Sequence, residues 1–336
     1  MKDINDMKLL KKIIRHFYKK LWKEEFYDKL RTIPIYDCYN KGFEYIWKEY
    51  FLNNTIKERT IQLCRNLSIE EQEFIKTIIF RHELFSNSIK FEDKYFINID
   101  SLYTAKETQE QKTVRIYKKY RFPENFFETS VLYYHNGLKL LNNNCLNYLK
   151  NKDFVDGGAC IGDSACIFEK EYNPKNIYSF EPLKSNLSAI NKTIELNSLT
   201  KVIAVPLGLG NKEEISTINI NNQDTGGSSI LQTHDSCEQE KIEITTLDKY
   251  SKEHALDIGL IKLDVEGFEW NVIQGAIETI KEQRPILLIS IYHTPKDFFE
   301  IKPFLENLNY KFKFSKLTPE VLIGEVMLLA YPQELD

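Results

Sequence analysis

The sequence predicts an α/β protein with a doubly wound, mostly parallel sheet, preceded by a mainly helical N-terminal region. Three observations predict this fold class. Most of the five strand candidates between residues 154 and 292 are continuous rather than alternating apolar runs, as in strands that are buried on both faces of a parallel sheet. Segments with helical spacing separate most of these runs, which is typical of doubly wound folds. The first third instead repeats its apolar residues at helical spacing.

The composition limits the function classes. The 336 residues suffice for about two domains, and 42% hydrophobic with 28% charged residues is ordinary for a globular protein. A net charge of −4 provides no basic field, so no nucleic-acid partner is expected. The six cysteines are scattered without metal-binding spacing, which favours free thiols in a reducing compartment. The charged N-terminus does not resemble a signal peptide and no apolar run spans a membrane, so we expect a cytoplasmic location.

The N-terminal region is predicted to contain three helices. Apolar residues recur at helical spacing from Leu10 to Trp22 and from Phe43 to Tyr50. The third helix begins at the segment SIEE, where Ser68 and Glu71 predict a capping box. The first helix is rich in lysine, and we expect a packed helix with a solvated basic face rather than a membrane-surface helix.

A change of pattern near residue 112 predicts a domain boundary. An alternating pattern from Ile89 to Ile99 predicts a hairpin, and the polar segment AKETQEQKT follows it without any apolar period. We therefore divide the chain into residues 1–112, a helical cover for the substrate or a partner, and residues 113–336, the cofactor-binding domain. The second part opens with a predicted helix that starts at Pro123, with Glu124 in its first turn.

The second part alternates strand and helix patterns. Strands are predicted at residues 154–156, 177–181, 202–206, 258–264 and 286–292. Between the third and fourth of these, the segments ISTINI and KIEITTL predict an antiparallel pair joined by the polar NNQDTGGSSI. Two late runs, YKFKFSKL and EVMLLAYP, predict an antiparallel C-terminal edge.

The stretch DFVDGGACIGDSACIF predicts a ligand at a glycine turn between a buried strand and a helix. It lacks the G-x-G-x-x-G spacing that seats a dinucleotide pyrophosphate. Asp156, just before the glycines, suits the ammonium and sulfonium groups of S-adenosylmethionine better than a pyrophosphate. Glu181 ends the next strand about 20 residues past the turn, where a carboxylate can accept hydrogen bonds from two ribose hydroxyls. The turn therefore favours S-adenosylmethionine.

The stretch LIKLDVEGFEW places charges in an apolar strand. Alternation puts Lys262 and Asp264 on one face, with Glu266 following if the strand continues. Such buried charges need an ion pair or a ligand, so Lys262 and Asp264 either pair as scaffolding or Asp264 faces the cofactor and the acceptor. His293 ends the fifth strand beside them. Lys262, Asp264, Glu266 and His293 are the candidate catalytic residues, since a carboxylate or a histidine can take the acceptor proton.

No metal site is predicted at this strand end. A divalent ion normally takes more carboxylate or carbonyl ligands than the strand end offers, so chelation is expected to have no effect. His234, in the insertion loop, is a weaker candidate base. Gly226, Gly227 and Ser229 of the same loop are candidates for a lid.

Four segments together resemble the FkbM-type S-adenosylmethionine-dependent methyltransferases: FVDGGACIGDSACIF, YSFEPLKSNLSAINKTIELN, ITTLDKY and above all IGLIKLDVEGFEWNVIQGA. The resemblance extends from about Phe126 to Tyr310. It implies a class I methyltransferase (Rossmann-like) fold and methyl transfer to a hydroxyl of a sugar, a glycan precursor or a related small molecule. The implied cofactor contacts are Asp156, Gly158, Gly162 and Glu181, and the predicted cofactor site also includes Gly157, Ala159, Ser164 and Pro182.

Two other functions stay open at this point. A nicotinamide-dependent oxidoreductase would share the fold and the Glu181 position, but this sequence lacks the dinucleotide fingerprint of such enzymes. A non-catalytic module would bind the cofactor or nothing and recruit a partner through its helical N-terminal region. For the methyltransferase, the expected partner is a small-molecule or glycan acceptor, with no nucleic acid and no transmembrane segment. Whether the protein forms a homo-oligomer also stays open.

Overall fold

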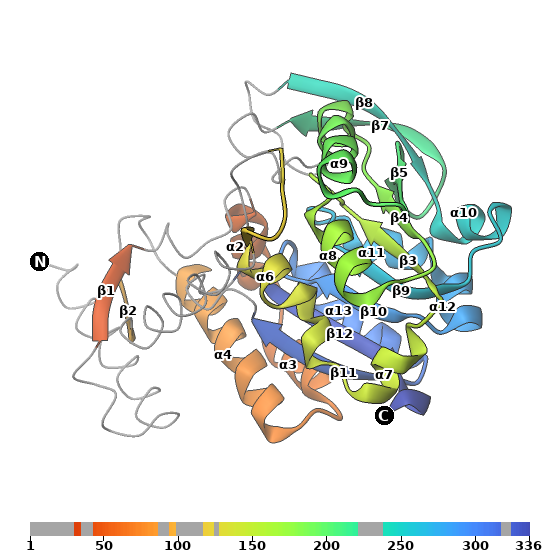
Figure 1. Ribbon diagram of the computed structural model, residues 1–336. Coiled ribbons are helices and arrows are strands. Elements are labelled where there is room, and N and C mark those ends of the chain that lie inside the picture. Colours follow the sequence, from red (N-terminus) through yellow and green to blue (C-terminus); the bar gives the residue numbers. More distant parts are fainter. Residues whose placement is uncertain are drawn as a thin grey trace, which may run out of the picture.

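A seven-stranded sheet forms the centre of the protein (Figure 1). The structure, a computed structural model, describes residues 30–34, 43–86, 94–98, 117–123, 128–220, 238–316 and 324–336. In sheet order the strands are β11 (Tyr310–Lys316), β12 (Val326–Pro332), β10 (Ile286–Ser290), β9 (Ile258–Leu263), β3 (Asp153–Gly157), β4 (Ile177–Phe180) and β5 (Val202–Val205). β12 is antiparallel to both of its neighbours, while the other paired strands are parallel. The predicted fold class is therefore confirmed, with its antiparallel C-terminal edge.

The five predicted parallel strands are present, each within two residues of its expected bounds. Their continuous apolar sequences follow from burial on both faces, since every residue of β3, β9 and β10 is buried. Alternate residues serve opposite faces: Phe154 packs in one hydrophobic cluster and Val155 in the other. The sheet is therefore a central layer that needs helices on both sides.

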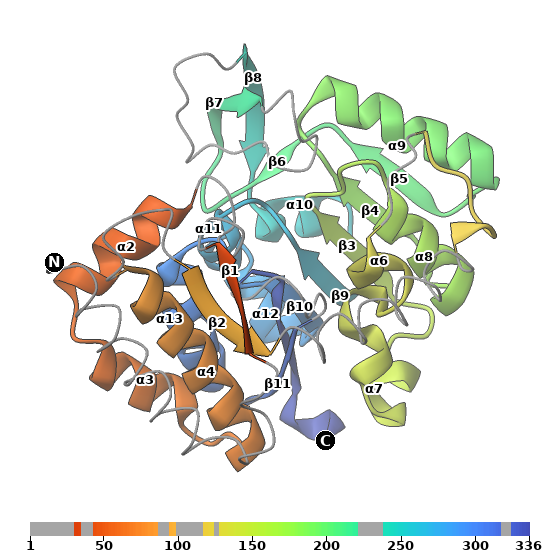
Figure 2. The same ribbon diagram turned by 90° about the vertical axis from the view of Figure 1, so that its left-hand side faces the viewer.

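Helices cover the two faces (Figure 2). One cluster joins a sheet face to α10 (Leu247–Glu253), α11 (Glu269–Gln274), α12 (Ile277–Gln283) and α13 (Pro295–Glu306). The other joins the opposite face to the 3-10 helix η3 (His135–Leu140), α7 (Asn143–Tyr148) and α8 (Asp163–Tyr172). α9 (Lys184–Asn197) packs beside α8 and β5. This is the doubly wound arrangement in which ligands bind at the carboxyl ends of the strands.

Three N-terminal helices form an outer layer against α13, namely α2 (Glu44–Asn53), α3 (Ile56–Cys64) and α4 (Ile69–Ser86). The predicted capping box is confirmed: Ser68 Oγ accepts from the Glu71 backbone N–H at 3.2 Å, and Glu71 Oε2 accepts from the Ser68 N–H at 3.1 Å. The first predicted helix, from Leu10 to Trp22, lies outside the described residues. α3 was not predicted, because its sequence IKERTIQLC carries few apolar residues.

The structure tests two further local predictions. The hairpin expected from Ile89 to Ile99 lies partly outside the described residues, and its described part, β2 (Lys94–Asn98), pairs with β1 (Leu30–Pro34), a distant segment. The second prediction was wrong. The single helix expected from Pro123 onward is replaced by the short α6 (Thr129–Leu132), η3 and α7. The reason is the backbone of η3, where Asn136 and Gly137 have positive φ, which a continuous α-helix does not allow.

The insertion between the third and fourth parallel strands forms a separate small sheet. It consists of β6 (Gly208–Leu209), β8 (Glu238–Thr245) and β7 (Glu214–Ile220), in that order. β7 and β8 are antiparallel, which confirms the predicted pair. The segment that joins them, with its proposed lid residues and His234, lies outside the described residues.

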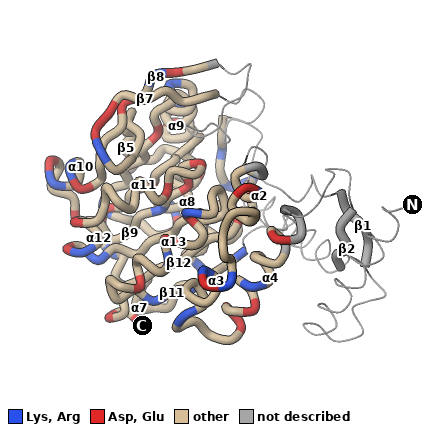
Figure 3. The backbone as a smooth tube through the Cα atoms, turned by 180° about the vertical axis from the view of Figure 1, so that it is seen from behind, with Lys and Arg blue, Asp and Glu red and all other residues tan. Residues whose placement is uncertain are grey.

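In the view of Figure 3, positions of Lys and Arg and positions of Asp and Glu are interspersed along the described backbone. This distribution agrees with the balanced composition of the chain. Within the described part of the chain, none of the helices has the length and apolar character needed to span a membrane.

The N-terminal helices share one hydrophobic core with the sheet. Phe43, Trp47, Leu63 and Ile75 lie in the same buried cluster as residues of the central strands. A fragment of residues 113–336 is therefore expected to aggregate, because loss of these helices uncovers apolar surface. Size-exclusion chromatography of the fragment beside the full chain measures this. A monomeric fragment with a cooperative thermal transition would contradict a shared core. The boundary at residue 112 itself stays a prediction.

Candidate active site

The glycine turn after β3 is held against both neighbouring strands. The N–H groups of Gly158 and Ala159 donate to the Phe180 carbonyl at 3.1 and 3.2 Å. Gly158 has φ +73°, and a Cβ there would lie 1.8 Å from the Asp264 carbonyl oxygen. At Gly157 a Cβ would lie 2.9 Å from the Leu263 side chain. Glycine is thus required at Gly158, by its positive φ and by backbone contact with the residue after β9, whereas the contact at Gly157 is with the flexible end of a side chain.

Lys262 pairs with Asp156, not with Asp264. Asp156 and Lys262 lie opposite each other on β3 and β9, and Lys262 Nζ is 3.1 Å from Asp156 Oδ1. Lys262 Nζ also donates to the Gly158 carbonyl at 2.8 Å. Burial alone would lower the pKa of Lys262, but the carboxylates of Asp156 and Asp264 outweigh it and raise the pKa. The predicted scaffold pair of Lys262 with Asp264 is therefore corrected, and Lys262 supports the cofactor turn.

Glu181 lies just beyond β4 and faces the glycine turn. Its Oε2 accepts from the Cys160 N–H at 3.1 Å and its Oε1 from the Leu183 N–H at 3.0 Å. These bonds fix the carboxylate, and each oxygen keeps a further lone pair for another donor. Burial raises the pKa of Glu181 to about 7, although the backbone donors oppose this. The next residue, Pro182, is half-buried.

The helix α8 begins directly after the turn, behind Gly162 at φ +80°. Asp163, at its first position, accepts from the Ser164 N–H at 2.8 Å, and burial raises its pKa to about 6. Ser164 Oγ accepts from Asn136 at 3.0 Å. A residue of η3, outside the glycine turn, thus holds the Ser164 side chain in place. Asp163 was not among the predicted site residues, although it follows the last glycine directly.

The loop after β9 turns sharply at Glu266 and Gly267, which have φ +53° and +90°. Asp264 directly follows the last residue of β9, and Glu266 lies at the turn itself. Asp264 keeps 30% of its side chain exposed. Glu269, the first residue of α11, is fully buried, and its Oε1 accepts from the Val265 N–H at 2.8 Å. The loop therefore presents carboxylates at the carboxyl edge of the sheet.

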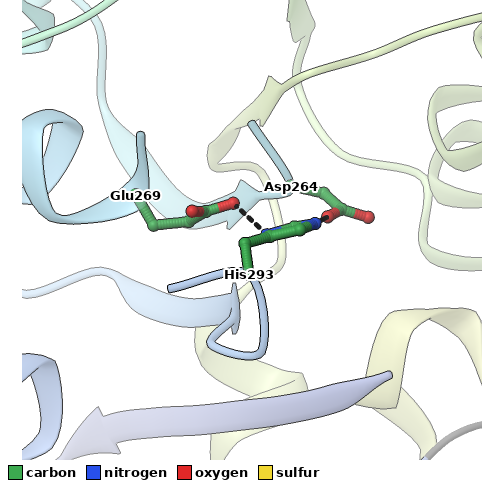
Figure 4. A group of neighbouring side chains, drawn as sticks. All are labelled: Asp264, Glu269 and His293. Atoms are coloured by element: carbon green, nitrogen blue, oxygen red, sulfur yellow. Dashed lines mark ion pairs between the residues drawn. The ribbon is translucent and has the colours of Figure 1, made fainter. Parts of the chain in front are cut away.

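His293 follows β10 and lies between these carboxylates (Figure 4). Its Nδ1 is 3.0 Å from Glu269 Oε1, while its Nε2 lies 3.7 Å from Asp264 Oδ1 and 3.6 Å from Glu266 Oε2. Burial alone would lower the pKa of His293, but Glu269 and Glu266 outweigh it and raise the pKa well above 6.5. The structure thus brings together Asp264, Glu266 and His293 as predicted. Glu269 was missed.

The N-terminal helices support His293. Trp47 Nε1 donates to the main-chain oxygens of His293 and Tyr292 at 3.0 and 3.2 Å. The Phe43 ring lies 5.3 Å from the His293 ring, between centroids. The region predicted as a cover therefore also holds a candidate catalytic residue in place.

Carboxylates outnumber cationic groups at this edge of the sheet. Glu128 and Glu325 interact electrostatically with Asp264, and burial raises the pKa of Glu128 well above 4.5 and that of Glu325 to about 7. Neither residue was predicted as part of the site. Glu128 directly precedes α6 and Glu325 directly precedes β12, and no sequence motif marks either position. The site thus favours a cationic ligand over an anionic one.

Part of the chain is similar to known methyltransferases. Residues 156–312 match the methyltransferase FkbM domain. The chain is similar to Methyltransferase 1 of Beauveria bassiana (strain ARSEF 2860), with 22% identity over 176 residues that cover 46% of this chain and 71% of that protein.

A solved structure shares the fold. It is the methyltransferase FkbM from Methylobacillus flagellatus KT, with 18% identity and a TM-score of 0.54. The match covers 86% of this chain and 62% of that one, so this chain spans less than two thirds of its length.

Proposed function

We propose that this chain, which carries a methyltransferase domain of the FkbM family at residues 156–312, transfers a methyl group from S-adenosylmethionine to a hydroxyl of a sugar, a glycan precursor or a related small molecule. One observation carries the proposal. The cofactor turn packs directly on the strand end that bears Asp264, so a methyl donor and an acidic proton acceptor would meet at one edge of the sheet.

The residues at the turn fit S-adenosylmethionine. Asp156 is fully buried, and no hydrogen bond of ordinary geometry reaches its carboxylate from the described residues; its ion pair is with Lys262. Glu181 is placed to accept from a ribose diol. When bound, the cofactor supplies a methyl group activated by a sulfonium. Its two cationic groups suit the surplus of carboxylates, whereas a dinucleotide pyrophosphate would be repelled.

Asp264 is the residue best placed to take the acceptor proton. It is partly exposed at the site, while Asp156 and Glu269 are fully buried. His293 Nε2 lies 3.7 Å from Asp264 Oδ1, and Glu269 Oε1 lies 3.0 Å from the other ring nitrogen of His293. Placing the hydroxyl in line with the methyl group contributes about 7–11 kcal/mol, and proton removal contributes a further factor of about 10²–10⁴ in rate. The main task of these residues is thus placement.

The acceptor is identified with isotopically labelled S-adenosylmethionine and a panel of sugars, nucleotide sugars and other hydroxyl compounds. We expect a labelled product whose methyl group resists mild base, as an ether does and an ester does not. Methyl transfer confined to nitrogen or carbon acceptors would contradict the proposed O-methylation.

The affinity for S-adenosylhomocysteine is expected to fall as the pH is lowered from 8 to 5. The ionised form of Glu181 accepts ribose hydrogen bonds, and with its pKa raised to about 7 by burial it is progressively protonated over this range. Calorimetric titrations at several pH values measure the effect. In Glu181→Gln the affinity should depend less on pH than in the wild type. The matched variant Glu195→Gln, on the exposed side of α9, should keep the wild-type dependence of affinity on pH. Equal slopes in wild type and Glu181→Gln would show that the ribose contact is misplaced.

A further inference from the structure

We propose that Asp264, Glu266 and His293 bind one divalent transition-metal ion through Asp264 Oδ1, Glu266 Oε2 and His293 Nε2. In this arrangement Glu269 orients the imidazole ring from its Nδ1 side. Two of the proposed ligands, Asp264 and His293, and the orienting residue Glu269 place possible ligand atoms within 4.8 Å of one another. The acidic residues come from the loop after β9 and the start of α11, and His293 comes from the segment that follows β10.

Several buried polar atoms of this group lack a hydrogen bond. His293 is 1% exposed and Glu269 is fully buried, yet among the described residues no hydrogen bond of ordinary geometry reaches His293 Nε2, Asp264 Oδ1 or Glu269 Oε2. Buried polar atoms in native proteins almost always have a partner. The Nε2 atom in particular points between two carboxylates at 3.6 and 3.7 Å, beyond hydrogen-bond distance.

These separations are close to those of two ligands of one ion. Nitrogen and oxygen ligands lie about 2.0–2.2 Å from such a metal, which places neighbouring ligands about 2.8–3.6 Å apart. The Nε2 atom lies 3.7 Å from Asp264 Oδ1 and 3.6 Å from Glu266 Oε2. An ion between Nε2 and each of these carboxylates therefore needs only small side-chain adjustments.

Glu269 prepares His293 for this role. Its Oε1 is fixed by the Val265 N–H and lies 3.0 Å from His293 Nδ1, so a ring proton on Nδ1 would face this carboxylate and leave the lone pair of Nε2 for the ion. A carboxylate behind a metal-binding histidine is the usual arrangement in metalloproteins. The carboxylates of Asp264 and Glu266 lie 3.7 and 3.6 Å from His293 Nε2, so a positive charge at this point is favoured, either a proton on His293 or a metal ion.

The ligand types select the metal class. One imidazole and two carboxylates suit first-row ions such as Mn²⁺ or Zn²⁺ better than Ca²⁺, which takes oxygen ligands only. This inference departs from the expectation drawn from the sequence, which predicted no metal site at this strand end because the strand end alone offers too few ligands. The binding of the ion is independent of the proposed function. Only a role of the bound ion in holding the acceptor hydroxyl rests on that function.

The test uses the full-length protein, stripped with a chelator and then dialysed, and Mn²⁺ alone as the probe. Electron paramagnetic resonance counts free Mn²⁺ during a titration without cofactor or acceptor. We expect one Mn²⁺ per chain with a Kd in the micromolar range, and competition by Zn²⁺. Asp264→Ala and His293→Ala should weaken binding at least tenfold, and Glu269→Gln by about 10–100-fold. The matched variants Asp257→Ala and His254→Ala, on the surface near α10, should bind as the wild type does.

Each outcome decides the question. A wild-type protein that takes up neither Mn²⁺ nor Zn²⁺ below millimolar concentration overturns the inference, and His293 then carries a proton. Unchanged binding in a folded His293→Ala protein overturns the assigned ligands. Circular dichroism identifies unfolded variants, and the wild-type titration still decides if a variant does not fold. Metal binding without methyl transfer to any acceptor would contradict the proposed function alone, whereas methyl transfer by protein shown to be metal-free would contradict only the role of the ion in holding the acceptor hydroxyl.

Discussion

Asp264→Asn is expected to reduce methyl transfer by about 10²–10⁴-fold while S-adenosylhomocysteine binding stays within about tenfold. The substitution keeps the shape of the side chain but removes the group that takes the acceptor proton. Stability should change little, because the buried cation Lys262 has Asp156 as its ion-pair partner. Single-turnover assays with the identified acceptor measure the rate, and calorimetry measures the affinity.

Asp257→Asn is the matched control, since Asp257 keeps 54% of its side chain exposed in a surface pair with Lys152. It should retain wild-type turnover. If turnover of Asp264→Asn fell only in proportion to the folded fraction, Asp264 would be scaffolding rather than a catalytic residue.

Lys262→Met is expected to lower the free energy of unfolding by about 3–5 kcal/mol, because it leaves Asp156 buried without its counter-charge. Both side chains are nearly inaccessible, with 4% and 0% exposed. The Gly158 carbonyl would also lose its donor, so cofactor affinity should fall as well. Chemical denaturation followed by circular dichroism measures the stability.

Lys152→Met removes a lysine from a partly exposed pair and should cost about 1 kcal/mol or less. The double variant Asp156→Asn with Lys262→Met should recover part of the loss, because no buried charge remains. Equal stability of Lys262→Met and Lys152→Met would show that the buried pair is not what holds the turn on β9.

The strands of the central sheet could be predicted from the sequence, because strands that are buried on both faces need continuous apolar runs. β3, β9 and β10 were therefore predictable from local composition alone. The break at η3 was not, because it depends on positive φ at Asn136, a conformation that no periodic pattern reveals. The pairing of β1 with β2 was also beyond reach, since it joins segments far apart in the chain.

The site was predicted as a set of strand ends rather than as a set of contacts. Because parallel strands end at one edge, Asp264 and His293 were expected to meet, and they do. The partner of Lys262 depended instead on register: Asp156 lies opposite it on the neighbouring strand, whereas Asp264 lies two residues further on the same strand. Glu269 was missed because its position follows from the turn at Glu266, where φ is positive.

A calorimetric titration of the wild-type protein with S-adenosylhomocysteine, and then with NAD, tests the central claim most directly. The claim is that the glycine turn and Glu181 bind S-adenosylmethionine beside the carboxylates of the β9 loop. It predicts binding of S-adenosylhomocysteine at micromolar strength, about −8 kcal/mol, with no appreciable heat from NAD. Tight NAD binding without a signal from S-adenosylhomocysteine would contradict it.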